Sequence, residues 1–188
     1  MIKYFKYLSF QWQAKNLHAI HSPFLFLLIK DAVYKNALPK KPQLEINKND
    51  LLLLSILYYL QIETVFLFQG DKSFDQLLSK YQVFQPSTKI VHPNEVKINL
   101  NPIGVYILNE LSSIGQGLAF LKKIHREESY FVIIPHLRAS KGQMDFLKSI
   151  PLKEKGCVIL EFYPFALLIF RQECSSEYFK IRKWGSFR

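Results

Sequence analysis

The chain has 188 residues, of which 49% are hydrophobic and 21% are charged, and its formal net charge is +10. This length and hydrophobicity allow one folded domain with a sizeable core, so the composition excludes a largely disordered protein. The longest apolar run, residues 51–60, is about half the roughly 20 residues that a membrane-spanning helix needs. We therefore expect no transmembrane segment.

The N-terminus and the two cysteines predict where the protein resides. Lys3 and Lys6 interrupt residues 1–8, and no small-residue cleavage site follows an apolar stretch, so a secretory signal is not expected. Cys157 and Cys174 form neither a disulfide framework nor a set of metal ligands. The sequence predicts a cytoplasmic protein with reduced thiols and no metal.

Positive charge gathers at both ends of the chain. Residues 1–41 hold seven lysines and one acid, a net charge of +6, and residues 171–188 hold five basic and two acidic side chains, a net charge of +3. A basic surface attracts anions such as nucleic acid or acidic lipid without specifying one of them. Since no nucleic-acid motif accompanies the charge, a solvated surface is the simpler interpretation, and nucleic-acid binding by the basic ends and their aromatic residues is an alternative.

Residues 1–41 predict an N-terminal helical extension. Residues 3–16 fit an amphipathic helix. Ser22 and Pro23 predict a second helix over residues 24–34, because serine accepts a hydrogen bond from a free N–H and proline fits the first helical position. We expect both helices to pack through large side chains, and a leftover apolar face would make a homodimer contact. The expected packing residues are Phe5, Leu8, Trp12, Phe24 and Phe26.

The segment between this extension and the rest of the chain carries no clear ligand site. His18 and His21 lie three residues apart, but two histidines without a third ligand are a weak metal signal, so a structural role is expected. Residues 39–42, Pro-Lys-Lys-Pro, interrupt the helical pattern. They mark a linker to a domain that spans residues 42–188.

Residues 49–79 predict the start of an open α/β sheet. They contain an apolar helical run, a short strand, a polar turn with one glycine and a second amphipathic helix, in that order. Such a unit surrounds the central strand of many open sheets, where ligands bind, so residues 64–68 are expected to form the central strand. Asn49 or Asp50 is expected to cap the first helix. The four parts are residues 51–60, 64–68, 69–73 and 73–80.

The remaining elements predict a mixed sheet. Further strands are expected over residues 89–92, 105–108 and 130–134, and helices over residues 112–126 and 140–149. In the final third, residues 157–162 and 165–170 flank a Tyr-Pro turn and predict an antiparallel hairpin, with residues 178–182 pairing nearby. The fold class is therefore α/β, with a Rossmann-like, mostly parallel sheet of about five to seven strands that ends in an antiparallel hairpin.

The sequence contains no complete catalytic motif. Gly115 and Gly117 begin like a dinucleotide fingerprint, but Phe120 takes the third glycine position and no acid follows at the required distance. A helix start is the simpler interpretation. There is no Gly-x-Ser-x-Gly elbow, and neither cysteine has a histidine nearby in the sequence. Whether the protein is an enzyme stays open on this evidence.

Several separated pieces of the chain match, in order, pieces of one known group. Residues 18–26, His-Ala-Ile-His-Ser-Pro-Phe-Leu-Phe, are similar to the opening His-Gly-Val-His-Ser-Pro-Phe-Val-Phe of a group of bacterial class I S-adenosylmethionine-dependent methyltransferases. Residues 49–79 resemble that group's helix, strand and Leu-Glu-Leu-Gly-Thr-Ser-Leu-Gly loop. Residues 136–144 resemble its Ile-His-Trp-Ser-Lys-Glu-Met, and residues 165–171 and 178–182 resemble its closing Gly-Ile-Val-Phe-Phe-Arg and His-Phe-Lys-Ile-Arg.

The resemblance covers nearly the whole chain and implies a class I fold with S-adenosylmethionine as cofactor. It places the cofactor pocket at the ends of the first, second and fourth strands of that family. The family's first strand ends in an acid and a glycine-rich turn, whereas here Phe68 replaces the acid and Phe74 replaces the second glycine. A phenyl group there would fill space that the cofactor needs. The candidate pocket positions in this chain are Gly70, Asp71, His92 and Asn109.

Other departures from the family concern the ribose and the length of the scaffold. His92 stands where the second strand should end in an acid for the ribose hydroxyls, Asn109 replaces an aspartate, and Ile134-Pro135 replaces an acidic pair. Residues 92–102 are too few for the helix, strand and helix of the family. Together these changes predict a shortened scaffold that has lost its cofactor and serves as a binding or assembly module. The alternatives are an active methyltransferase with a divergent pocket and a basic nucleic-acid-binding protein; the sequence names no substrate or partner.

Overall fold

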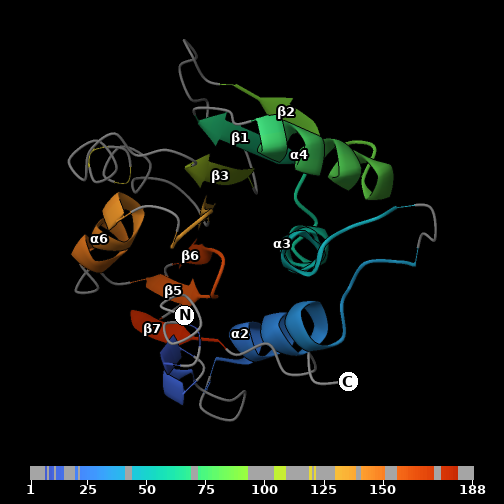
Figure 1. Cartoon of the computed structure of the whole chain (residues 1–188). Coiled ribbons are helices and arrows are strands. Elements are labelled where there is room, and N and C mark those ends of the chain that lie inside the picture. The colour runs from blue at the N-terminus through green and yellow to red at the C-terminus, as the bar shows by residue number, and fades with distance from the viewer. Residues whose placement is uncertain are drawn as a thin grey trace.

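The computed structural model places helices on both faces of a seven-stranded mixed sheet (Figure 1). The α/β fold class predicted from the sequence is therefore confirmed. The structure describes residues 7, 9–10, 12–14, 20, 22–40, 44–68, 72–92, 104–108, 119, 121, 130–138, 141–150, 156–171 and 175–181, without the side chains of residues 68, 72 and 73.

Helices and strands alternate along most of the described chain. The helices are α2 (Pro23–Leu28), the π-helix η2 (Ile29–Tyr34), α3 (Lys48–Tyr59), α4 (Lys72–Phe84) and α6 (Lys141–Ser149). The strands are β1 (Thr64–Phe68), β2 (Lys89–Val91), β3 (Gly104–Leu108), β4 (Tyr130–Ile134), β5 (Cys157–Glu161), β6 (Ala166–Phe170) and β7 (Glu177–Lys180). Single described residues at 7, 9, 10, 12 and 13, and at 119 and 121, are also helical.

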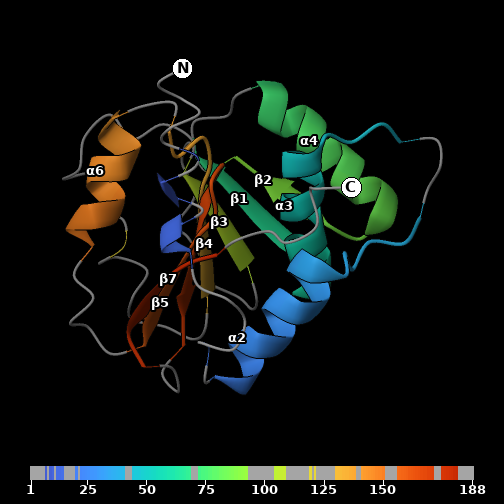
Figure 2. The same ribbon diagram turned by 60° about the horizontal axis from the view of Figure 1, so that its bottom comes forward.

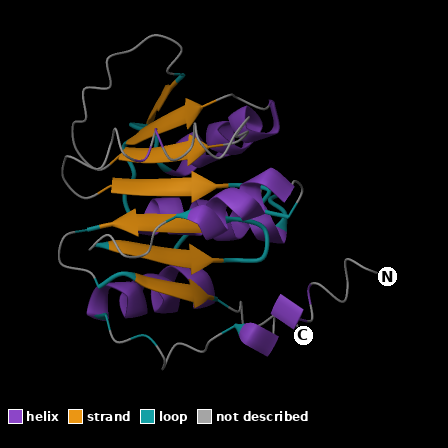
Figure 3. Cartoon of the chain, turned by 90° about the vertical axis from the view of Figure 1, so that its left-hand side faces the viewer, coloured by secondary structure: helices purple, strands orange, loops and turns teal. Residues whose placement is uncertain are grey.

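The strand order is β2-β1-β3-β4-β6-β5-β7, and only β6 runs against its neighbours. Figure 3 shows β6 as the one described strand whose arrow points the other way. The predicted hairpin is confirmed, since Val158 pairs with Ile169 and Glu161 pairs with Ala166 in antiparallel register.

One part of the predicted topology is wrong, because β1 is an interior strand but not the central one. In the described sheet only β2 lies beyond β1 on one side, whereas five strands follow on the other, and the central strand is β4. The connection from β2 to β3 is short, and the three C-terminal strands all extend the opposite side of the sheet. The central strand is therefore β4 and not β1, because most later strands are added on the β3 side of β1.

Both faces of the sheet are covered, which explains the continuous apolar runs in its strands. β3, β4, β5 and β6 are buried at every position. Alternate side chains point to opposite faces, so Val105 and Ile133 join one core with α2, η2, α3 and α4, and Tyr106 and Val132 join a second core with α6. Figure 2 shows α6 on one side of the sheet and the other labelled helices across from it.

Local signals explain where the helices begin. Ser22 Oγ accepts a hydrogen bond from the N–H of Leu25 at 3.5 Å, and Pro23 is the first residue of α2, as predicted. The cap of α3 is Asn47 and not Asn49 or Asp50, because Asn47 Oδ1 accepts hydrogen bonds from both of their N–H groups at 3.0 and 2.9 Å. The helix therefore begins earlier than expected, because one oxygen of Asn47 satisfies two free N–H groups.

The second half of the predicted helix 24–34 is a π-helix that leads into a turn at Asn36, which has a φ of 62°. Ser55 of α3 holds this region in place, since its Oγ donates to the carbonyl of Ala32 at 2.6 Å and accepts from the N–H of Ala37 at 2.7 Å. η2 and α3 thus share one core. The division of the chain at residue 41 stays a prediction.

The predicted packing of the N-terminal helices is partly wrong. Trp12 is 92% exposed, while Phe10 is 4% exposed and makes the buried contact in its place. Phe24 and Phe26 are half-buried, and Leu25 and Leu28 provide the buried face of α2. Phe5 and Leu8 lie outside the described residues, and so do His18, His21, Gly115, Gly117 and most of the predicted helix 112–126. The homodimer contact stays a prediction.

Helix α4 is longer than the sequence expectation. α4 runs to Phe84, beyond the predicted end at residue 80, because Tyr81 is fully buried and its hydroxyl donates to the carbonyl of Leu57 at 3.0 Å. Burial raises the pKa of Tyr81 well above its ordinary value.

In the part of the chain that is described, no helix has both the length and the apolar character that crossing a membrane requires.

Candidate functional site

The edge of the sheet where parallel strands end is the place where open α/β sheets bind ligands. Because β6 alone is antiparallel, the carboxyl ends of β1, β2, β3, β4, β5 and β7 lie at one edge. The strand order reverses direction between β1 and β3, which makes that point the expected ligand site. Three of the four candidate pocket residues, Gly70, Asp71 and Asn109, lie outside the described residues.

His92 is the candidate pocket residue that the structure describes. It follows β2, its side chain is 52% exposed, and its Nε2 atom lies 3.8 Å from Oδ1 of Asp75 on α4. An exposed pair of this kind contributes between 0 and about 1 kcal/mol to stability. A neutral imidazole has one acceptor nitrogen, so it does not replace a carboxylate that accepts hydrogen bonds from both ribose hydroxyls.

Phe74 occupies the same region from the first turn of α4. It is 4% exposed and packs with the core residues of β1. Its ring lies 5.9 Å from the ring of His136, at an angle of 87° between the ring planes. His136 follows β4, and β3 lies between β1 and β4, so this ring contact crosses the carboxyl end of β3.

The backbone helps to bring His136 to this position. His136 follows Pro135 and has a φ of 50°, a left-handed conformation that histidine adopts more readily than most side chains. Its ring packs edge-on against Phe74, a favourable arrangement for aromatic groups. The two rings therefore fill space between the segments that follow β1 and β4.

The described residues of this edge do not fit S-adenosylmethionine as the family resemblance implies it. Phe74, which the resemblance places at the second glycine position, is a buried phenyl group, and His92 brings an imidazole to the end of β2, where the resemblance implies a carboxylate. Asp75 lies beside His92, but it comes from α4 and is paired with that imidazole. No step of a methyl transfer can be derived from these side chains.

A second group of polar side chains lies farther along the same edge. Glu161, the last residue of β5, is 1% exposed, and its Oε1 atom accepts a hydrogen bond from Nη2 of Arg138. Nη1 of Arg138 also donates to the carbonyl of Tyr163 at 2.6 Å. Tyr178 of β7 donates its hydroxyl to Oε2, the other oxygen of Glu161. Both carboxylate oxygens are thus satisfied, which a buried ion pair requires.

The strand register explains why Tyr178 reaches Glu161. Tyr178 pairs with Ile159, two residues before Glu161 on β5. Side chains two apart on a strand share a face, so the tyrosine and the carboxylate lie on the same side of the sheet. Burial, together with the hydrogen bond to Glu161 and its negative charge, raises the pKa of Tyr178 well above the ordinary tyrosine value.

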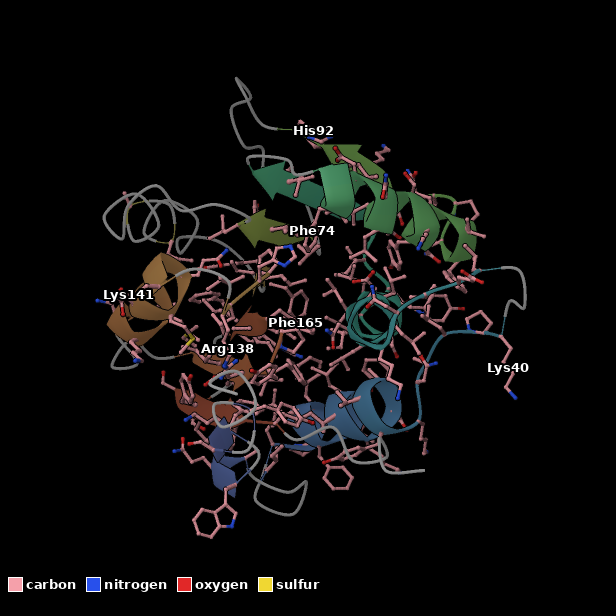
Figure 4. All side chains as sticks on the ribbon, in the orientation of Figure 1. Lys40, Phe74, His92, Arg138, Lys141 and Phe165 are labelled. Atoms are coloured by element: carbon pink, nitrogen blue, oxygen red, sulfur yellow. The ribbon has the colours of Figure 1, made fainter. Side chains whose placement is uncertain are left out.

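The N-terminal helix packs on this ion pair. The guanidinium carbon of Arg138 lies 4.7 Å from the centre of the Phe10 ring and 4.5 Å from the centre of the Tyr163 ring. Tyr7 adds an edge-on contact with Tyr163 at 4.9 Å. A planar guanidinium stacks well on aromatic faces while its N–H groups donate in the plane. We call Arg138, Glu161, Tyr163, Tyr178 and Phe10 the arginine clamp; Figure 4 labels Arg138 beside the N-terminal helix.

Sequence reasoning assigned no role to the members of the arginine clamp. The available signal was Glu161, a charged residue at the end of an apolar strand that must find a partner once it is buried. Its partner Arg138 is 23 residues away in the sequence, and no local pattern joins the two. The residues of the clamp could therefore be suspected singly but not as a group.

Comparisons with known proteins add no identity: no protein-family model, no curated protein and no solved structure matches the chain significantly. The resemblance to class I methyltransferases rests on the quoted residues and stays a prediction. In the described segments, no three or more His, Cys, Asp or Glu side chains are grouped so that they could hold a metal ion.

Proposed function

We propose that this protein is a methyltransferase-like domain that no longer binds S-adenosylmethionine and acts as a binding or assembly module. The observation that carries the proposal is the packing of Phe74 against His136 across the carboxyl end of β3. In the implied scaffold this space belongs to the cofactor. A phenyl ring that is 4% exposed in the protein core cannot turn aside without opening a cavity.

The chemistry at the end of β2 supports the same proposal. A hydrogen bond between a carboxylate and a ribose hydroxyl typically contributes about 1.5–3 kcal/mol, and each loss of about 1.4 kcal/mol lowers affinity tenfold. His92 replaces that carboxylate in this chain. Loss of one such bond, combined with the obstruction by Phe74, would take a micromolar ligand to roughly millimolar affinity or weaker.

The sheet supports a shortened scaffold of the implied class. Parallel strands are followed by a C-terminal antiparallel pair, and β6 lies between β4 and β5. Within the described sheet β2 is the edge strand, as expected for a chain that is too short between β2 and β3 to supply another strand there. The arginine clamp supports the same proposal, because its polar groups contact one another and the chain's own N-terminal helix.

The decisive experiment is a calorimetric titration with S-adenosylmethionine and S-adenosylhomocysteine. Each titration is run at two temperatures. Burial of apolar ligand surface changes the heat capacity, so the heat of binding cannot be zero at both temperatures. The proposal expects no binding heat at either temperature. A dissociation constant in the micromolar range would contradict it and favour an active methyltransferase with a divergent pocket.

A further inference from the structure

The N-terminal helix has an inner and an outer face of different character. The inner side chains are buried or half-buried against the domain, and the outer side chains are exposed. Among the described residues, Tyr7, Phe10 and Ala14 lie on the inner face, and Ser9, Trp12 and Gln13 lie on the outer face. Trp12 is 92% exposed, although indole usually buries much of its large apolar surface.

The helix that carries Trp12 is fixed in place. Phe10 packs on Arg138 of the arginine clamp, which buries the face opposite Trp12. On the outer face, Gln13 accepts a hydrogen bond from the ammonium group of Lys180, the last residue of β7. Figure 1 shows the N-terminal helix beside β7. The indole therefore projects from a held position, with a lysine anchored at the neighbouring residue.

This contact joins one described residue from each of the two basic ends of the chain. Gln13 lies in residues 1–41, which carry a net charge of +6, and Lys180 lies in residues 171–188, which carry a net charge of +3. Among the described residues, Lys180 is the positive charge that this contact places beside the helix that carries Trp12. A positive charge there attracts an anionic partner and repels a second copy of the same surface.

The polar neighbours of Trp12 distinguish between anionic partners. Ser9, three residues before Trp12 on the helix, and Gln13 are both exposed and polar. A helix that lies in a lipid surface needs a broad apolar face, which these described residues do not provide. A planar ring on a helix whose next residue, Gln13, holds an ammonium group instead matches the repeating unit of a single-stranded nucleic acid, in which an exposed base alternates with a phosphate.

We propose that the outer face of the N-terminal helix, centred on Trp12 and flanked by Lys180, binds single-stranded nucleic acid. The indole stacks on a base and the ammonium group of Lys180 contacts a backbone phosphate. Since every base has a π-face, the site is tolerant of sequence. This site is separate from the space closed by Phe74 and does not rest on the loss of S-adenosylmethionine.

The test measures fluorescence anisotropy of a labelled single-stranded oligonucleotide of about 12 nucleotides mixed with the full chain. Trp12→Ala should lower affinity about tenfold, because stacking on one aromatic side chain accounts for a loss of this size. Trp12→Phe should retain most of the affinity. Leu27→Ala is the matched control, since Leu27 is also a large exposed side chain, at 43% exposure, but lies on α2.

Salt dependence tests the phosphate contact separately. Binding is measured between ~50 and ~200 mM salt, where each neutralised phosphate of a single strand adds about 0.7 to the slope of log affinity against log salt. Lys180→Gln should reduce that slope by about 0.7. Lys141→Gln, at an exposed lysine of α6, should leave it within error of the original protein.

Several results would overturn the proposal. One is no oligonucleotide binding at ~50 mM salt by protein whose circular dichroism shows that it is folded. Another is unchanged affinity in Trp12→Ala. A third is Trp12-dependent binding to vesicles that contain phosphatidylserine without any to the oligonucleotide, which would assign the surface to lipid. A fourth is a dimer that Trp12→Ala dissociates in sedimentation, which would assign it to a second copy.

Discussion

Two regions at the same edge of the sheet differ in polarity. At the ends of β1 and β3 the aromatic rings of Phe74 and His136 meet where a ligand would need space and polar partners. At the ends of β4 and β5 the arginine clamp is strongly polar, yet the oxygens of its buried carboxylate are satisfied within the chain. The difference teaches that charged residues on a ligand-binding edge indicate a site only when some of their hydrogen-bonding capacity is left for a ligand.

The largest effect is expected from breaking the ion pair of the clamp. Glu161→Gln leaves the guanidinium of Arg138, which is 20% exposed, without its counter-charge, and removing one partner of a buried pair costs about 3–5 kcal/mol. Urea denaturation measures the change in the free energy of unfolding. The matched control is Glu177→Gln, at a surface hydrogen bond of β7, where a change within about 0.5 kcal/mol is expected. Equal effects of the two substitutions would contradict a structural role for the clamp.

The next effect concerns the aromatic pair at the other region. Phe74→Ala should lower the free energy of unfolding by about 3 kcal/mol, because it removes a buried ring and leaves a cavity. Val83→Ala on the same helix is the control, since Val83 is 44% exposed. If Phe74 instead lined an open ligand pocket, water would fill the vacated space and the two substitutions would cost similar amounts.

The elements that the sequence predicted best have local signals at both ends. β4 has the predicted bounds, since an apolar run ends at Pro135, and the β5–β6 hairpin follows from two apolar runs around a Tyr-Pro turn. The order of strands has no such signal, because it depends on which side of β1 later strands pair. The central position expected for β1 was therefore wrong, although its residues and its place inside the sheet were right.

The N-terminal helix illustrates a second limit of sequence reasoning. Aromatic residues occur all around residues 3–16, so helical periodicity alone does not decide which of them is buried. The decision comes from Arg138, which lies more than 100 residues later and offers its guanidinium to Phe10. Trp12 falls on the opposite face for that reason. The candidate pocket, in contrast, came from the family resemblance, and only His92 of its four residues lies in the described part of the chain.

A smaller, pH-dependent effect is expected at Tyr178. Its pKa is raised in the folded protein, whereas the unfolded chain ionises near pH 10. The stability from this shift is fully present below about pH 10 and is lost as pH rises further. Tyr178→Phe should cost about 1.5–3 kcal/mol at pH 8, through the lost hydrogen bond to Glu161.

The difference in the free energy of unfolding between Tyr178→Phe and the original protein should then be smaller at about pH 11 than at pH 8. Comparing the variant with the original protein cancels the contributions of Tyr59 and Tyr81, whose pKa values are raised in the same direction. Urea midpoints at the two pH values provide the measurement. A difference in the free energy of unfolding that is the same at both pH values would mean that ionisation of Tyr178 does not contribute to the pH dependence of folding.

The smallest expected effect tests the proposed loss of the cofactor pocket. His92→Asp returns a carboxylate to the end of β2, and Phe74→Ala opens the space above β3, but each variant corrects only one of the two defects. Neither single variant should show a rise in melting temperature with about millimolar S-adenosylmethionine, since a ligand stabilises measurably only when its concentration exceeds its dissociation constant. The double variant should show a rise if these two positions are the main obstacles, because one change supplies the ribose partner and the other the room to reach it. A rise with His92→Asp alone would mean that the ring of Phe74 does not obstruct the cofactor, and the loss of binding would then be a matter of charge at the end of β2.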